Sequence, residues 1–281
     1  MEKWLVVSFF MMILSSCSTQ DVNSEKSVEQ KKAELYYSQG TTELVQKKYQ
    51  DALINLLKAA EYDPNDSHIR NNLGMAYYFR EQPDLAINEL QRSIDLDPKN
   101  SDARVNLGSI FMEKNRLKEA KAQYDIVSKD LTYRNQFRNF YNLALLALRI
   151  GDRKEAFEYL DKSIKDKEDY CQAHFKLGEL YMEEYKFTQA LSSFQEASKG
   201  TCVSEPAPHY QQALALMNLN RFEEARMKLK MLIEKHPKTR FFSLSQVQLK
   251  KITEEIREHA TLKNFQTETV KESKSVESPN F

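Results

Sequence analysis

A 34-residue repeat is the feature of this chain that most constrains its fold. Gly40, Gly74 and Gly108 follow one another at intervals of 34 residues, and an alanine stands twelve positions after each glycine. Those alanines are Ala52, Ala86 and Ala120. A fixed period of this length indicates that one small structural unit is stacked several times, so that each unit buries the apolar face of its neighbour.

The repeat resembles the tetratricopeptide repeat, which is a pair of antiparallel helices. Pro64 and Pro98 close the first two units, where the second helix must stop because proline cannot continue it. The resemblance divides the chain into six units, at 33–66, 67–100, 101–134, 137–170, 171–204 and 206–239. It implies an all-α fold, a right-handed superhelix (α-solenoid) of six tetratricopeptide repeats.

The chain after Pro237 is predicted to complete this solenoid. Leu244, Val247, Ile252 and Ile256 recur at mostly helical spacing, and the last unit of a solenoid needs a helix to cover it. We therefore expect a C-terminal capping helix over residues 240–264. Residues 265–281 contain few apolar groups and are predicted to be disordered.

The composition excludes several other classes of protein. Six glycines and seven prolines are too few for a turn-rich β fold, and 41% hydrophobic residues are too few for a multi-pass membrane protein. Lys plus Arg number 41 and Asp plus Glu number 41, so no basic surplus favours a nucleic-acid partner.

The N-terminus has the layout of an export signal. Lys3 precedes an apolar run from Leu5 to Leu14, which as a helix would rise about 15 Å, roughly half a bilayer core. Leu14-Ser-Ser-Cys17 resembles the lipobox of bacterial lipoproteins, in which the cysteine is acylated and becomes the mature N-terminus. The alternative is an ordinary secretory signal with a chance cysteine. We predict a signal peptide at 1–16 and a lipidated Cys17.

The lipoprotein resemblance also implies a location. Acyl chains on Cys17 would hold the protein on a membrane surface. Ser18 follows the cysteine where an Asp would resemble the inner-membrane retention signal of enteric bacteria, so we expect the periplasmic face of the outer membrane. Residues 17–32 are predicted to be the lipidated cysteine and a flexible tether.

The other two cysteines are expected to form a disulfide. Cys171 opens the first helix of unit five and Cys202 follows its second helix, so antiparallel packing brings them together. Export favours the disulfide, whereas the alternatives are two free thiols or a zinc site that adds His174 and His209. No HExxH, GxSxG or phosphate-binding loop occurs in the sequence, so we expect neither enzymatic activity nor a cofactor or metal.

A partner-binding groove is implied by the repeat resemblance. In tetratricopeptide repeats the first helices line the concave face, with positions 5, 9 and 12 of each unit pointing inward. Position 12 is apolar or aromatic in every unit, and so are most residues at position 5 and several at position 9, which suits an amphipathic helix or an extended apolar peptide. The predicted groove residues are Tyr37, Met75, Tyr78, Met112, Tyr141, Leu145, Phe175, Met182, Tyr210 and Met217. The alternative is that these side chains serve packing alone.

The whole arrangement resembles the type IV pilus biogenesis and stability lipoproteins. They are pilotins, which help an outer-membrane secretin to reach its membrane and assemble. The resemblance implies a lipid-anchored scaffold that holds a secretin subunit or another envelope protein in its groove. One alternative is a repeat adaptor for cell-wall hydrolases or outer-membrane protein assembly. A zinc enzyme built on the cysteine and histidine cluster is another.

Overall fold

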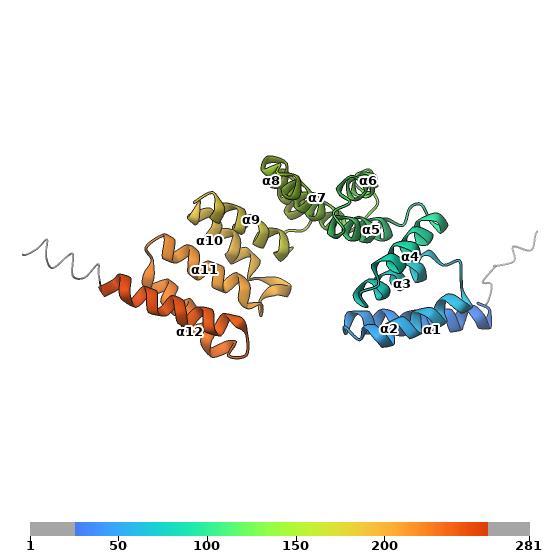
Figure 1. Cartoon of the computed structure of the whole chain (residues 1–281), viewed down its shortest axis with the longest axis horizontal. Coiled ribbons are helices and arrows are strands. Elements are labelled where there is room, and N and C mark those ends of the chain that lie inside the picture. Colours follow the sequence, from blue (N-terminus) through green and yellow to red (C-terminus); the bar gives the residue numbers. More distant parts are fainter. Residues whose placement is uncertain (1–25, 258–281) are drawn as a thin grey trace, which may run out of the picture.

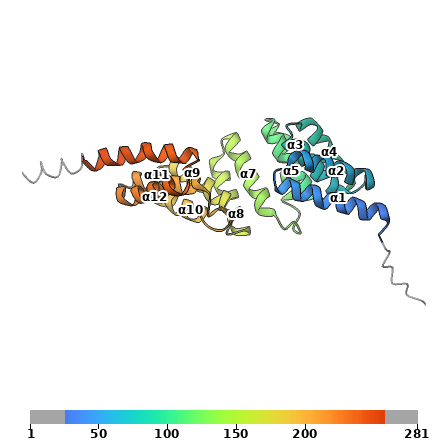
Figure 2. The same cartoon turned by 90° about the horizontal axis from the view of Figure 1, so that it is seen from below.

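The computed structural model describes residues 26–257, and the regular structure of these residues is helical. Figure 1 shows helix pairs that follow one another along an arch, and in Figure 2 α7 lies near its middle. The pairs are α1 (Val28–Val45) with α2 (Tyr49–Tyr62), α3 (Ser67–Phe79) with α4 (Pro83–Leu96), α5 (Ser101–Glu113) with α6 (Leu117–Val127), α7 (Gln136–Ile150) with α8 (Arg153–Asp166), α9 (Cys171–Glu183) with α10 (Phe187–Ala197), and α11 (Pro206–Asn218) with α12 (Phe222–Lys235). A short 3-10 helix, η1 (Gly200–Cys202), precedes α11, and a further helix covers residues 240–257. The six pairs coincide with the six predicted units.

Several predicted segments lie outside the described residues. These are the signal peptide at 1–16, Cys17, the tail at 265–281 and the last part of the capping helix, 258–264. Among residues 26–257, no helix combines the length and the apolar character that crossing a bilayer requires.

The predicted tether at 17–32 extends too far toward the first repeat. Residues 28–32 belong to α1, because Ser27 and Gln30 form a capping box. The Ser27 hydroxyl accepts a 3.1 Å hydrogen bond from the Gln30 amide, and Oε1 of Gln30 accepts one of 2.9 Å from the Ser27 amide. Two backbone donors are thereby satisfied, and the helix begins at Val28.

Glycine at position 8 of a repeat makes room for a large side chain at position 24. A Cβ added to Gly108 would lie 2.5 Å from Cε1 of Tyr124, and one added to Gly178 would lie 2.6 Å from Cε1 of Phe194. Both rings are fully buried. In repeat four an alanine, Ala144, occupies position 8 instead of glycine.

The first repeat differs from the next three at position 7. Position 7 is the exposed Gln39 in α1, whereas repeats two, three and four bury a leucine there. Those leucines are Leu73, Leu107 and Leu143, each at most 2% exposed. Gln39 therefore departs from the repeat pattern at a position that the described residues leave exposed.

Two second helices are shorter than the others, and side chains of the next repeat complete them. Helices α6 and α10 have 11 residues, against 14 in α4 and α8. Nδ2 of Asn139 donates a 3.2 Å hydrogen bond to the carbonyl of Tyr124 in α6. Nε2 of Gln212 likewise donates one of 2.8 Å to the carbonyl of Phe194 in α10. The chain has extra residues before repeats four and six, and these bonds replace the missing last turn of each helix.

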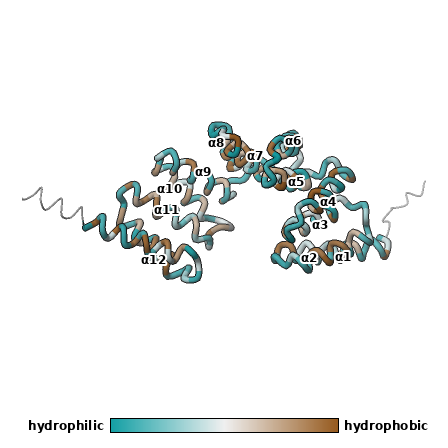
Figure 3. The backbone as a smooth tube through the Cα atoms, in the orientation of Figure 1, coloured by the Kyte–Doolittle hydropathy of each residue, from teal (hydrophilic) through white to brown (hydrophobic). Residues whose placement is uncertain are grey.

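The helix at 240–257 covers the last repeat, as predicted for a capping helix. Ser245 and Ile252 are fully buried, and the ring of Phe241 lies 5.5 Å from that of Tyr210. Leu244 and Val247, which the helical spacing groups with Ile252, are 38% and 54% exposed and contribute little to this contact. They lie on the outer side of the helix because Ser245 and Ile252 set the buried side. Figure 3 shows the mixture of apolar and polar residues along this and the other helices.

Candidate functional site

The predicted groove residues lie on the first helices of the six pairs, and most of them are half-buried. One side of each packs on the hydrophobic core, which leaves the other side open. The residues placed in this way are Tyr37, Tyr78, Met112, Tyr141, Met182 and Met217. Met75, Leu145 and Phe175 are half-buried as well. Tyr210 is only 8% exposed and packs beneath Phe241 of the covering helix, so it belongs to the core and not to an open groove.

Four separate cavities open along this row of first helices. Tyr37 lines one of about 330 Å³, and Tyr78 lines one of about 540 Å³. Tyr141 and Phe175 share a smaller cavity of about 180 Å³, and Met217 lines one of about 480 Å³. Cavities therefore open at several points along the row.

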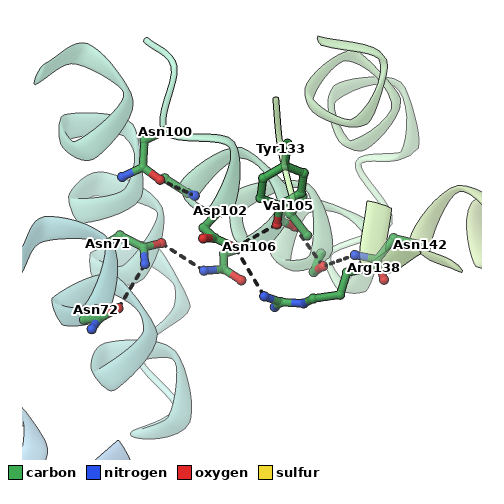
Figure 4. A network of polar contacts seen from close by, with 11 residues as sticks. Asn71, Asn72, Asn100, Asp102, Val105, Asn106, Tyr133, Arg138 and Asn142 are labelled. Carbon is green, nitrogen blue, oxygen red and sulfur yellow. Dashed lines mark hydrogen bonds and ion pairs between the residues drawn. The ribbon is translucent and has the colours of Figure 1, made fainter. Parts of the chain in front are cut away.

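A ladder of asparagines crosses the first helices in the N-terminal part of this row (Figure 4). Nδ2 of Asn72 donates to the Thr41 hydroxyl at 2.9 Å, and its Oδ1 accepts from Asn71 at 3.0 Å. Nδ2 of Asn106 donates to Oδ1 of Asn71 at 2.9 Å, which ties α5 to α3. Nδ2 of Asn142 donates to the Ser109 hydroxyl at 3.1 Å, which ties α7 to α5. The ladder joins the first helices of repeats one to four.

This ladder was not foreseen, although the sequence contains a signal for it. Asn72, Asn106 and Asn142 all occupy position 6 of their repeats. Their partners Thr41, Asn71 and Ser109 stand at positions 5 and 9, where the prediction kept only the apolar and aromatic residues. The structure places these polar groups between the aromatic and methionine side chains. A surface with both kinds of group can contact the backbone as well as the side chains of a peptide.

Polar contacts also hold α5 and α7 together across the insertion before repeat four. The Tyr133 hydroxyl donates to Oδ1 of Asp102 at 2.7 Å, and Nη1 of Arg138 lies 3.3 Å from the same oxygen. Burial, together with the Asp102 carboxylate, raises the pKa of Tyr133. These residues adjoin the asparagine ladder in Figure 4 and fix the relative positions of the two helices.

Tyr78 links α3 to α5 on the same side of the molecule. Its hydroxyl donates a 2.5 Å hydrogen bond to Oε1 of Glu113. Burial, followed by the hydrogen bond and the charge of Glu113, raises the pKa of Tyr78 to about 12. The tyrosine is therefore neutral, and the carboxylate it contacts is held in place.

Cys171 and Cys202 are joined by a disulfide with a Cα–Cα distance of 6.3 Å. Both cysteines line the small cavity that also includes Tyr141, Phe175 and Pro208. The bond connects the start of α9 to η1, so it anchors one wall of this cavity.

The two histidines considered as zinc ligands bind backbone carbonyls. Nε2 of His174 lies 2.8 Å from the carbonyl oxygen of Glu168, and Nε2 of His209 lies 3.4 Å from that of Val203. Burial lowers the pKa of His209. Arg70 occupies the same repeat position and contacts the carbonyl six residues before it, that of Pro64, at 2.9 Å and 3.0 Å. These side chains thus hold the turn between repeats, and no cluster of three or more metal-binding side chains occurs within residues 26–257.

The sequence matches known protein families that have this architecture. Three segments match tetratricopeptide-repeat families, at residues 80–132, 137–169 and 209–239. The fold is a tetratricopeptide-repeat solenoid. This confirms the predicted fold class.

One of the relatives found by sequence is a pilus assembly protein. The chain is 24% identical over 165 residues to the type IV pilus assembly protein PilF of Pseudomonas aeruginosa, which covers 59% of this chain and 63% of that protein. The match thus spans less than two thirds of the relative. An uncharacterized Haemophilus influenzae protein is 27% identical over 148 residues, which is 52% of this chain and 80% of that one.

Solved structures share the fold of this chain. The structure of P. aeruginosa PilF has a TM-score of 0.65 at 20% identity, with 79% of this chain and 100% of that chain covered. The structure of PilW, described as a widely conserved type IV pilus biogenesis factor, has a TM-score of 0.65 at 16% identity and covers 75% and 97% of the two chains. The chain is therefore similar to type IV pilus biogenesis proteins that carry tetratricopeptide repeats.

Proposed function

We propose that this protein is a non-enzymatic, lipid-anchored scaffold that acts as a pilotin for a type IV pilus secretin. Its lipidated Cys17 places it on the periplasmic face of the outer membrane. The row of half-buried side chains on the first helices holds a segment of the secretin subunit. The protein thereby brings the subunit to the membrane where it assembles. The sequence similarity to the type IV pilus assembly protein PilF supports a role in pilus assembly.

The observation that carries the scaffold function is the row of half-buried aromatic and methionine side chains along α1 to α11. Each has one side on the core, and cavities open beside several of them. Half-buried side chains of this kind lose little conformational freedom when a partner covers them, which favours binding. The asparagine ladder adds hydrogen-bonding groups within the same row.

A pair of methionine variants tests the binding surface. Met75 in α3 is half-buried on the row, whereas Met227 in α12 is 63% exposed and lies away from it. We expect Met75→Glu to weaken binding of the purified secretin subunit by about tenfold or more, and Met227→Glu to leave it unchanged. Melting temperatures of both variants show whether they remain folded. Equal binding by a folded Met75→Glu variant would show that the row is not the recognition surface.

The anchor and the pilotin role are tested in cells. In a strain lacking this protein, we expect fewer assembled secretin rings in the outer membrane, with recovery by the parent gene and not by Cys17→Ser. Cell fractionation and detection of the secretin multimers measure both effects. Normal secretin assembly without this protein would contradict the pilotin role. Crosslinking that captured cell-wall hydrolases in place of secretin would favour the adaptor alternative.

A further inference from the structure

A cavity of about 540 Å³ lies between the C-terminal ends of α3 and α5. Tyr78 and Phe79, the last residues of α3, form part of its wall, and Glu113 closes it from the end of α5. Glu81, in the turn after α3, and Lys114 complete its charged part.

The aromatic part of this cavity belongs to a cluster of three contacting rings. The ring of Phe79 stacks on that of Tyr49 at 4.7 Å and meets that of Tyr78 at 5.2 Å. Phe79 is nevertheless 41% exposed, so part of its ring is open to solvent. The exposed part of an aromatic ring can contact a cation, because the face of the ring is electron-rich.

The charged part of the cavity has an excess of negative groups. Nζ of Lys114 lies 2.8 Å from Oδ1 of Asp84, so this lysine is already paired. Within residues 26–257, neither Glu81 nor Glu113 forms an ion pair. The C-terminal ends of α3 and α5 add the partial negative charge of their carbonyl groups.

An equivalent cavity lies at the other end of the solenoid. It has a volume of about 480 Å³ and lies between the end of α11 and the helix at 240–257. Met217 and Asn220 line it from the same repeat positions as Tyr78 and Glu81. Glu254 and Glu255 supply two carboxylates, and Lys251 supplies one ammonium group. Cavities therefore occur at corresponding places in repeats two and six, and carboxylates outnumber ammonium groups in both.

We propose that the cavity between α3 and α5 binds an arginine or lysine side chain of a protein partner. The apolar stem of such a side chain lies against Phe79 and Tyr78, and its charged end reaches Glu81 and Glu113. The hydrogen bond from Tyr78 orients the Glu113 carboxylate, whose other oxygen remains available to accept from the partner. This inference rests on the proposed function to the extent that the partner is a protein. It adds that the bound segment of the partner contains a basic residue beside its apolar residues.

A titration with small model compounds tests the cavity without the partner. N-acetyl-arginine methylamide and N-acetyl-lysine methylamide are added to the isotopically labelled, full-length mature chain, and backbone amide signals are followed by NMR. N-acetyl-citrulline methylamide is the control because it has nearly the shape of arginine without its charge. We expect saturable shifts at Phe79, Glu81 and Glu113 with a basic compound and not with citrulline.

Matched variants then show whether the carboxylates of Glu81 and Glu113 are responsible for binding the basic compounds. We expect Glu81→Gln and Glu113→Gln each to weaken arginine binding about two- to fivefold, and the double variant to remove the preference over citrulline. Glu158→Gln, on the exposed side of α8, carries the same charge change and should have no effect. The NMR spectra of the variants show whether the fold is retained.

Equal shifts with citrulline, shifts only at distant residues, or an undiminished affinity of the double variant would each overturn the inference. These outcomes are independent of the secretin experiments. Binding of the arginine compound without any secretin binding would support the proposed site and refute the pilotin role. Secretin binding with no response to the arginine compound would refute only the proposed site.

Discussion

Nε2 of Gln212 donates a 2.8 Å hydrogen bond to the carbonyl oxygen of Phe194, and so joins the start of repeat six to the end of α10. Gln212 is 1% exposed and occupies position 7, where repeats two, three and four have a leucine. Because α10 stops at Ala197, this carbonyl lies at the end of the helix, where backbone acceptors need partners from elsewhere. The glutamine thus replaces an apolar contact with a hydrogen bond at a junction that contains an inserted residue.

We predict that Gln212→Leu lowers the free energy of unfolding by about 1–3 kcal/mol, because the buried Phe194 carbonyl loses its donor. Urea denaturation followed by circular dichroism measures the change. Gln39→Leu is the matched control, since Gln39 occupies the same repeat position but is exposed on α1. A Gln212→Leu variant as stable as the parent would show that the hydrogen bond is not needed at this junction.

We predict that Gly178→Ala destabilises the protein by about 1–3 kcal/mol, because its Cβ would lie 2.6 Å from the buried ring of Phe194. Phe194→Leu should compensate in part, since Ala144 is accommodated at the same position in repeat four, where position 24 is Leu160. Thermal unfolding of both single variants and the double variant gives the coupling free energy. Strictly additive effects would refute the proposed contact.

We predict that reducing the Cys171–Cys202 disulfide lowers the free energy of unfolding by about 3–4 kcal/mol, since the bond closes a loop with a sequence separation of 31. Helix content at room temperature should not change, because the other repeats keep their neighbour contacts. Circular dichroism with and without reductant measures both effects. Alkylation under denaturing conditions followed by mass analysis counts free thiols, and two alkylated cysteines in unreduced protein would contradict the disulfide.

We predict that Tyr78 titrates at about pH 12 and that Glu113→Gln lowers this pKa, because one of its causes is removed. Burial also raises the pKa values of Tyr124 and Tyr141 to about 12. Since the folded state holds these protons more tightly than the unfolded state, stability should fall as the pH rises from about 10 toward 12. Ultraviolet difference titration and alkaline unfolding curves measure the two effects. An unchanged Tyr78 pKa in Glu113→Gln would refute the coupling.

Local features of the sequence predicted much of the fold. Gly108 and Ala120, for example, indicated the close approach of two helices, because only small residues fit there. The capping box of Ser27 and Gln30 was also readable as a helix start, but the repeat register directed attention to residue 33 instead. The order of the helix pairs followed from the repeat alone.

The residues of the proposed binding surface could not all be predicted, because contacts between repeats decide which side chains stay exposed. Tyr210 and Tyr141 occupy the same repeat position, yet the helix at 240–257 buries the first while the second lines a cavity. Asn106 reaches Asn71 from 35 residues away, because α5 lies beside α3.

The sequence by itself determined the repeated helix pair, because small residues, helix caps and helix breakers act over a few neighbouring residues. Only the tertiary structure decided which faces stay open, because the exposure of a side chain depends on what the next repeat places over it. The cavity between Phe79 and Glu113 illustrates this, since its two walls come from helices of different repeats.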